Sequence, residues 1–218
     1  AIVYIFLGFL LFLLDSQVGN RKKQALLLQK SREAELQFLR SQINPHFLFN
    51  TLNNIYSLVY EQSDKAPAAM LRLSDMMRYM LYEKKETVPL AKEWDYISSF
   101  VELQKLRFHE EPAIVLTAEG NLDAHLIPPY LLIPFVENAF KHGDLRDAAD
   151  PLTITLAAGD GDIRFRVQNK ISHRNKDESG GVGLDNVRRR LELIFPGRHT
   201  LQTGSDGRQH AATLILKL

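Results

Sequence analysis

The chain has 218 residues, a formal net charge of +1 and no cysteine. So small a charge does not favour a nucleic acid or another polyanion as partner. Without cysteine there is neither a disulfide framework nor a thiolate metal site, which leaves an ordinary globular protein rather than a disulfide-rich secreted scaffold.

The N-terminal residues 1–14 are almost all apolar, and Arg21, Lys22 and Lys23 follow shortly after. A helix needs about 20 apolar residues to cross a bilayer, so this stretch is too short by itself. Because the chain does not begin with Met, we interpret residues 1–20 as the end of a transmembrane helix and its cytoplasmic flank. A buried helix is the alternative, and a secretory signal peptide fits less well because no basic region precedes the apolar run. We expect a protein of the cytoplasmic membrane, with residues from about 20 onward in the cytoplasm.

A long helix is predicted over residues 24–62, because apolar residues recur there at three- and four-residue steps. Asp64–Pro67 is expected to form a turn before a returning amphipathic helix, whose apolar stripe is Met70, Leu73, Met77, Met80 and Leu81. A third helix is predicted over Lys92–Phe108, and the residues expected to be buried in it are Trp94, Ile97, Val101 and Leu106. Antiparallel helices with apolar stripes pair into four-helix bundles, so residues 21–111 predict a homodimer.

One histidine of the first predicted helix stands in an otherwise apolar segment. His46 follows Pro45, whose missing N–H and clash with the carbonyl group of Ser41 are expected to kink the helix and hold the imidazole outward. An imidazole titrates at about pH 6.5, so at neutral pH most of it is uncharged and nucleophilic. The alternatives are a histidine of the core and a residue of an ordinary first helical turn.

Beyond residue 112 short strands alternate with helices. The predicted strands are Ile114–Thr117, Leu152–Ala157, Ile163–Gln168 and Ala212–Leu218. Gly159–Gly161 is expected to form a hairpin turn between two of them. With helices on one face of the sheet and water on the other, residues 112–218 predict an α/β sandwich with its own core.

The segment Ile127–Gly143 combines an apolar run with a polar cluster at helical spacing. Its apolar side is predicted to bury Leu132, Phe135, Val136 and Phe140, and one edge carries Glu137, Asn138, Lys141 and His142. Carboxylate and amide oxygens are ligands that Mg²⁺ prefers, and a lysine and a histidine can meet phosphate oxygens. The alternative is an ordinary helix end with Gly143 as its cap, and both interpretations can hold together.

A glycine-rich turn, Ser179–Gly183, leads directly into an amphipathic helix. Glycines let backbone amides approach an anion, and a helix N-terminus adds partial positive charge, so this pair suits a di- or triphosphate. The polar stretch Lys170–Ser179 is predicted to form a lid over such a ligand; a flexible loop is the alternative for both segments. The other histidines show no metal-like spacing and are interpreted as surface residues: His109, His125, His173, His199 and His210.

In order and spacing, these segments resemble the sensor histidine kinases of the LytS type, a branch of the two-component signalling kinases. Gln42–Asn53 is similar to that family's phosphoacceptor box, Val136–Gly143 to its N box and Gly181–Leu191 to its glycine box. The resemblance covers most of the chain. It implies an α + α/β fold, in which a dimerising antiparallel helical hairpin is followed by an α/β sandwich ATP-binding domain with a mixed sheet.

The resemblance also implies roles for individual residues, with ATP and Mg²⁺ as cofactors. His46 would be the phosphoacceptor of the γ-phosphoryl group. Asn138 would hold Mg²⁺, and Glu137 would be a second candidate ligand and the candidate base, since Phe47 stands where many other histidine kinases have a carboxylate. The residues expected to bind ATP are Asn138, Lys141, His142, Asn169, Gly181, Gly183, Leu184 and Asn186.

Asn169 departs from the pattern of the wider gyrase, chaperone and MutL superfamily, which usually recognises adenine with an Asp followed by Gly after a strand. Here the predicted strand leads into Asn169 and Lys170. The amide oxygen of Asn169 can accept a hydrogen bond from an exocyclic amine, but it lacks the charge that strengthens such a bond, so weaker nucleotide affinity is expected. Alternatively, Asn169 only starts a turn.

The function implied by the resemblance is that of a membrane-associated sensor histidine kinase. It would autophosphorylate a histidine from Mg-ATP and pass the phosphoryl group to an aspartate in the receiver domain of a response regulator. One alternative is an ATP-binding conformational switch without phosphotransfer, which does not need His46. The other is a degenerate kinase scaffold that has lost ATP, for which Asn169 is the only indication.

Overall fold

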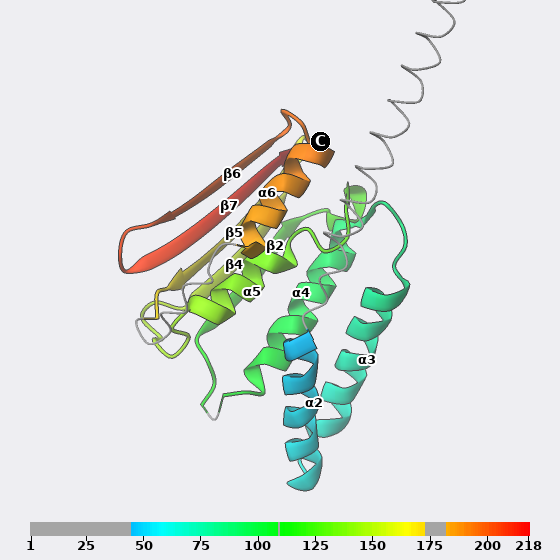
Figure 1. The fold of residues 1–218 in the computed structure, drawn as a ribbon, viewed down its shortest axis with the longest axis vertical. Coiled ribbons are helices and arrows are strands. Elements are labelled where there is room, and N and C mark those ends of the chain that lie inside the picture. The colour runs from blue at the N-terminus through cyan, green and yellow to red at the C-terminus, as the bar shows by residue number, and fades with distance from the viewer. Residues whose placement is uncertain (1–44, 109, 173–181) are drawn as a thin grey trace, which may run out of the picture. The chain divides into compact units, whose positions relative to one another are not determined.

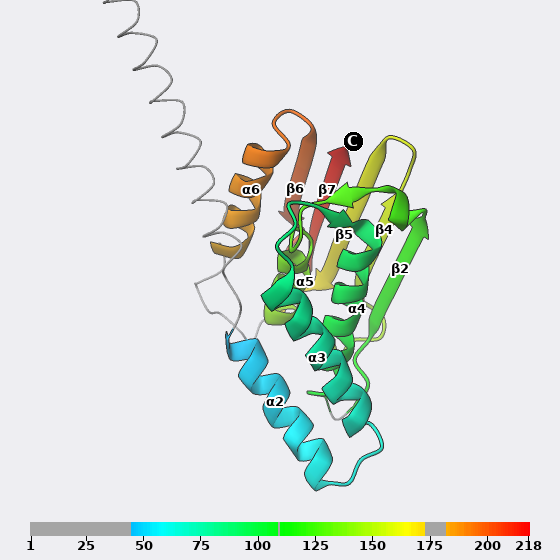
Figure 2. The same ribbon diagram turned by 90° about the vertical axis from the view of Figure 1, so that its right-hand side faces the viewer.

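Helices pack on one face of a five-stranded sheet in the computed structural model, which describes residues 45–108, 110–172 and 182–218 (Figure 1). Helices α5 (Ile133–His142) and α6 (Val182–Ile194) lie on the sheet, and α4 (Leu90–Lys105) packs against α5. Helices α2 (Pro45–Tyr60) and α3 (Ala66–Tyr82) form a hairpin on the far side of α4 (Figures 1 and 2). Among the described residues no helix covers the opposite face of the sheet, as predicted.

Several predictions concern residues before α2. The membrane segment 1–20, the first part of the long helix and the kink before His46 lie outside the described residues. None of the helices in the described part of the chain is both long enough and apolar enough to span a bilayer.

The returning helix and the third helix are present with shifted ends. The predicted turn Asp64–Pro67 is wrong at its end, because α3 already begins at Ala66. Pro67 fits the first turn of α3, where a backbone N–H is not needed. Helix α4 begins at Leu90 and ends before the predicted Phe108. Of its four predicted core residues, Ile97 and Val101 are buried, and two are only partly buried: Trp94 and Leu106.

The large sheet is mixed, as predicted. Its strand order is β2–β4–β5–β7–β6, in which β2 and β4 pair in parallel and all other neighbours pair antiparallel. The strands are β2 Ile114–Gly120, β4 Leu152–Ala158, β5 Asp162–Lys170, β6 His199–Ser205 and β7 Gln209–Lys217. The predicted hairpin turn between β4 and β5 is confirmed by a hydrogen bond of 2.9 Å from the Gly159 N–H to the carbonyl of Asp162.

The sequence pattern predicts neither β6 nor a small second sheet. Strand β6 lies at an edge and has Leu201 as its one large apolar residue, so it shows no alternation. The second sheet pairs β1 (Val88–Pro89) with β3 (Leu126–Ile127), and strands of this length have no detectable period. The second sheet depends on a contact between segments far apart in the chain, whereas β6 is held by a hairpin with the neighbouring strand β7.

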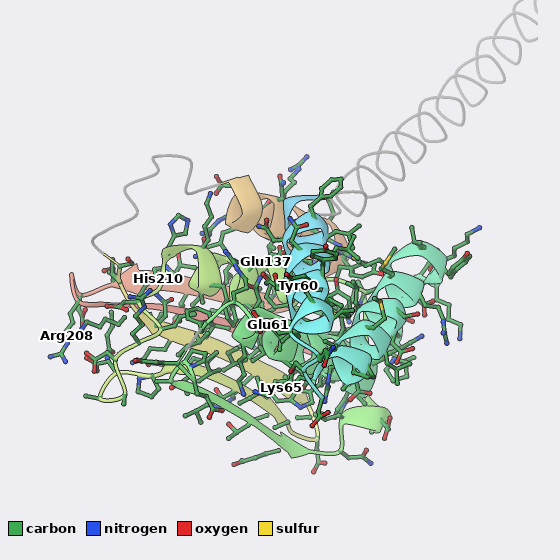
Figure 3. All side chains as sticks on the ribbon, turned by 90° about the horizontal axis from the view of Figure 1, so that it is seen from below. Tyr60, Glu61, Lys65, Glu137, Arg208 and His210 are labelled. Carbon is green, nitrogen blue, oxygen red and sulfur yellow. The ribbon has the colours of Figure 1, made fainter. Side chains whose placement is uncertain are left out.

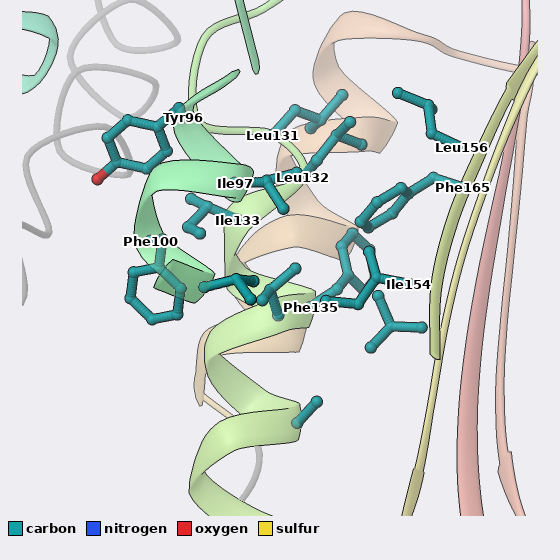
Figure 4. Packing of buried hydrophobic residues seen from close by; sticks show 14 of the residues in the cluster. Tyr96, Ile97, Phe100, Leu131, Leu132, Ile133, Phe135, Ile154, Leu156 and Phe165 are labelled. Carbon is teal, nitrogen blue, oxygen red and sulfur yellow. The ribbon is translucent and has the colours of Figure 1, made fainter. Parts of the chain in front are cut away.

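The core between the sheet and the helices holds α5 in place (Figure 4). Inward-facing residues of the strands alternate with outward ones, and Ile154 and Phe165 are at most 1% exposed. The ring centroids of Phe135 on α5 and Phe165 on β5 are 5.9 Å apart. Each such side chain contributes about 1.5–3 kcal/mol when it is buried. Since this side of α5 is anchored, the position of its other edge is determined as well.

The predicted domain division at residue 112 stays a prediction. Strand β1 and helix α4 precede it, yet β1 pairs with β3, and the Leu90 N–H donates to the carbonyl of His125 at 2.8 Å. All described residues belong to one compact unit. Helix α4 therefore contacts both the α2–α3 hairpin and the sheet-bound helices.

Candidate functional site

Helix α5 presents the predicted polar edge. Phe135, Val136 and Ala139 are buried, whereas Glu137 and Asn138 are partly exposed and Lys141 is exposed. The helix ends where the Gly143 N–H donates to the carbonyl of Ala139 at 2.8 Å. The amphipathic pattern thus places carboxylate, amide and ammonium groups along one accessible edge of the helix.

The end of β5 lies beside the end of α5. The Asp144 N–H donates to the carbonyl of Lys170 at 2.8 Å, and the Ser172 N–H donates to the carbonyl of His142 at 2.9 Å. An antiparallel bridge joins Gly143 to Ile171 between these two hydrogen bonds. Two segments that are far apart in the sequence, the candidate N box and the end of the β5 strand, therefore form one site.

Asn169 is part of β5 and is only 2% exposed, so the interpretation that it merely starts a turn is wrong. Its Nδ2 donates to the carbonyl of Lys170 at 2.9 Å. Lys170 also belongs to β5, where its ammonium group is 2.6 Å from a carboxylate oxygen of Asp147, so the predicted lid does not begin at Lys170. The rest of the predicted lid, from residue 173, lies outside the described residues.

His210 adds an imidazole to this end of the sheet. It lies on β7 directly opposite Asn169 and is partly buried rather than simply at the surface (Figure 3). Burial, with a smaller contribution from nearby His142, holds the pKa of His210 below its usual range. The strand pairing that brings His210 here is not visible in the sequence.

The glycine box is described from Val182 onward. Gly183 and Leu184 lie in the first turn of α6, Asn186 is partly exposed, and Gly181 lies outside the described residues. Helix α6 is anchored by buried residues of its inner face, Val187 and Leu191, and it packs against α5.

His46 lies in the first turn of α2, and its neighbour Phe47 is buried. The ring centroid of Phe47 is 4.7 Å from that of Phe100 on α4, and Phe100 is 5.6 Å from Phe140 on α5. Three rings thus connect the first turn of α2 to the candidate N box through α4. In this protein, position 47 therefore holds a buried phenylalanine that packs against Phe100, and not a carboxylate.

Sequence reasoning missed a buried polar cluster behind the site, made by Glu93, Tyr79, Tyr130 and Arg190. Glu93 is fully buried on the apolar face that α4 forms with Leu90, Ile97 and Phe100. The sequence did contain a signal for this cluster, because Glu93 stands at helical spacing from the apolar residues that face the core. Burial raises the pKa of Glu93, although hydrogen bonds from Tyr130, Tyr79 and Leu132 act in the opposite direction.

Replacing Gly143 by alanine is expected to destabilise the protein. A Cβ atom at this position would stand 2.4 Å from the carbonyl oxygen of Ala139 and 3.2 Å from Nδ2 of Asn169. Forced contacts of this kind cost about 1–3 kcal/mol. Gly161→Ala is the matched control, because a Cβ at Gly161 meets no atom within 4 Å. Thermal unfolding should show a lower midpoint for Gly143→Ala alone, and equal midpoints would contradict the close approach.

Comparisons with known proteins show which sequences this chain is similar to. A family model described as histidine kinase matches residues 34–112. Sensor protein LytS of Staphylococcus saprophyticus is 29% identical over 215 residues, which cover 91% of this chain and 36% of that protein. Sensor histidine kinase BtsS of Escherichia coli K12 is 34% identical over 187 residues, covering 84% of this chain and 33% of that protein.

Sensor protein LytS of Oceanobacillus iheyensis is 32% identical over 177 residues, which cover 73% of this chain and 30% of that protein. The chain therefore spans about a third of the length of these curated relatives. Among solved structures, histidine kinase AdeS of Acinetobacter baumannii is 14% identical with a TM-score of 0.44, covering 86% of this chain and 93% of that one. The matches to LytS proteins over most of the chain, together with the histidine kinase model, confirm the resemblance seen in the motifs: the chain belongs to the histidine kinases of the LytS type.

Proposed function

We propose that this chain is the kinase part of a membrane-associated sensor histidine kinase, which phosphorylates His46 from Mg-ATP and then passes the phosphoryl group to an aspartate of a response regulator. The observation that carries the proposal is the joining of the polar edge of α5 to the end of β5, with α6 packed against α5. This arrangement offers polar side chains for a purine, a metal and phosphates within one site.

In the proposed site, Asn169 faces the purine, and Lys141 and His142 meet phosphate oxygens. The backbone amides at Gly181 and Gly183 approach the phosphates, and Leu184 and Asn186 complete the binding surface. Asn138, with Glu137 beside it, offers oxygen ligands of the kind that Mg²⁺ prefers. Among the described residues there is no group of three or more acidic, cysteine or histidine side chains that could hold a metal by itself. Held by these two side chains, Asn138 and Glu137, Mg²⁺ would supply positive charge that neutralises the phosphates.

Neutral His46 attacks the γ-phosphorus in line, so that an N–P bond forms while the bond from phosphorus to the leaving oxygen of ADP breaks. Glu137 is the candidate acceptor of the ring proton. The protein contributes mainly position and charge, as is general for phosphoryl transfer. Phe47 supports the positioning, because its contact with Phe100 anchors the first turn of α2.

The α2–α3 hairpin supports the proposed homodimer. Large apolar side chains are exposed along both helices: Phe49, Leu52, Tyr56, Val59, Tyr60, Met70, Leu71, Leu81 and Tyr82. On α2, Phe49, Leu52, Tyr56 and Val59 recur at three- and four-residue steps, so they share one face of the helix. An exposed apolar helix face is typical of a protein interface. A second copy of the hairpin would complete a four-helix bundle. The membrane association is proposed from residues 1–20 alone.

Incubation of the chain with γ-labelled ATP should give acid-labile label, and His46→Gln should remove it. The substitution leaves the nucleotide site intact, so nucleotide binding by His46→Gln is the control. Label that persists in His46→Gln would reject His46 as phosphoacceptor. Nucleotide binding without any label on the wild type would favour the conformational switch instead.

A further inference from the structure

A buried carboxylate joins the helical hairpin to the nucleotide-site helices. Oε1 of Glu93 on α4 accepts hydrogen bonds from the hydroxyl of Tyr79 on α3 and from the N–H of Tyr130, both at 2.7 Å. Its Oε2 accepts from the N–H groups of Leu131 and Leu132 at 3.1 and 3.4 Å. All four partners are donors, so both oxygens of the buried carboxylate accept two hydrogen bonds each.

The backbone that Glu93 binds is the segment directly before α5. Tyr130 has a φ of 60°, an uncommon conformation for a residue other than glycine. Leu132 is the N-cap of α5, so Glu93 also satisfies N–H groups at the start of the helix that carries the candidate N box. The conformation of this segment is thus maintained by a side chain from another helix.

Helix α6 contributes to the same cluster from the other side. Arg190 is 4% exposed, and its guanidinium group donates to the carbonyls of Pro129 and Tyr130 at 2.6 and 3.2 Å. The hydroxyl of Tyr130 donates in turn to the carbonyl of Tyr79 at 2.6 Å. A network of these seven hydrogen bonds therefore ties α3, α4, the start of α5 and α6 to one another.

The cluster also reaches the candidate base. The rings of Tyr79, Tyr96 and Tyr130 pack together, with centroid separations of 5.0–5.7 Å. Burial, and to a smaller extent the nearby Glu137, raises the pKa of Tyr96. Glu137 is thus close enough to interact electrostatically with a ring of the cluster.

We propose that Glu93 is a positioning residue for autophosphorylation, which fixes the phosphoacceptor hairpin relative to the helices of the nucleotide site through its bond to Tyr79. This inference rests on the kinase function proposed above. The bonds of Glu93 to Tyr130, Leu131 and Leu132 order the nucleotide side of the cluster. Its bond to Tyr79 reaches the hairpin, beside the bond from the Tyr130 hydroxyl to the Tyr79 carbonyl.

The two sides of the cluster affect different kinetic constants. Tyr79→Phe removes the bond between Glu93 and α3. It leaves in place the ring packing, the bond from the Tyr130 hydroxyl to the Tyr79 carbonyl and the bonds of Glu93 to the α5 segment. The nucleotide site is then unchanged, while delivery of the hairpin to it is less well defined. We expect kcat for autophosphorylation to fall about tenfold, with KM for ATP within about twofold of the wild type.

Ser74→Ala is the matched control, because Ser74 lies on the same helix, is exposed and also loses a hydroxyl group. The wild-type chain, its Tyr79→Phe variant and its Ser74→Ala variant are compared for initial rates of acid-labile labelling over a range of ATP concentrations. A fall in kcat for Tyr79→Phe alone, without a change in KM, supports the inference. Equal kcat values for the two variants would overturn it, and so would parallel changes in kcat and KM for Tyr79→Phe, which indicate a general loss of structure.

A failure of this inference is distinct from a failure of the proposed function. If the wild type incorporates label and His46→Gln does not, the kinase function holds whatever Tyr79→Phe shows. Glu93→Gln provides a second comparison. It replaces one accepting oxygen of the carboxylate by an NH₂ group, which cannot accept the hydrogen bonds that this oxygen receives. It should raise KM for ATP as well as lower kcat, since the start of α5 loses its acceptors; an unchanged KM would contradict the role assigned to Glu93.

Discussion

Asn138→Ala is expected to weaken Mg-ATP binding by about a hundredfold or more, because it removes the side chain proposed to hold the metal next to the phosphates. Asn138 stands on the partly exposed edge of α5, whereas the buried residues of this helix, such as Phe135 and Val136, hold its position. The substitution should therefore leave the fold intact. Titration with a fluorescent ATP analogue measures the change in affinity directly.

The matched control is Asn121→Ala, the same substitution at an exposed loop position before the short 3₁₀ helix Leu122–Ala124. It should bind nucleotide as the wild type does. If Asn138→Ala also binds like the wild type, Asn138 has no part in the site. A wild type that fails to bind at millimolar ATP would favour the degenerate scaffold, the reading that Asn169 in place of an aspartate leaves open.

Phe100→Ala is expected to lower the free energy of unfolding by about 3–5 kcal/mol, the usual cost of removing a buried aromatic ring. Phe100 is 2% exposed and contacts Phe47 on α2 as well as Phe140 on α5. Its loss leaves a cavity between α2 and the candidate N box. Urea unfolding of the two proteins at one fixed concentration gives the difference.

Leu126→Ala serves as the control for Phe100→Ala, because Leu126 is 56% exposed and its truncation leaves no cavity. Its effect should stay below about 1 kcal/mol. Equal effects of the two substitutions would show that the connected rings do not hold α2 to α4. If the Phe100→Ala variant is less stable but its His46 is still labelled at the wild-type rate, the three rings contribute to stability and not to phosphorylation.

Local patterns were sufficient for much of the fold and of the site. The amphipathic spacing of α5 identifies its polar edge, and the period-two alternation in β5 identifies its buried face. These features are determined by neighbouring residues, which a sequence displays directly. The position of Asn169 beside Gly143 follows less directly, since it needs both the extension of β5 and the bridge to Ile171.

The remaining features depend on contacts that no local apolar pattern displays. Strand β6 is held by its hairpin with the neighbouring β7 rather than by its own apolar residues, and β1 is held by β3, which lies far from it in the chain. Glu93 receives its donors from residues 14 and 37–39 positions away in the chain. A single sequence shows a carboxylate on an apolar helix face but not the groups that satisfy it.

The central claim is that His46 receives the γ-phosphoryl group, and locating that group in the wild-type chain tests it most directly. The chain is incubated with Mg-ATP and digested at alkaline pH, where phosphohistidine survives, and the phosphopeptides are sequenced by tandem mass spectrometry. The account predicts a phosphoryl group on His46. A phosphoryl group on another side chain, such as His142, with His46 unmodified would contradict it.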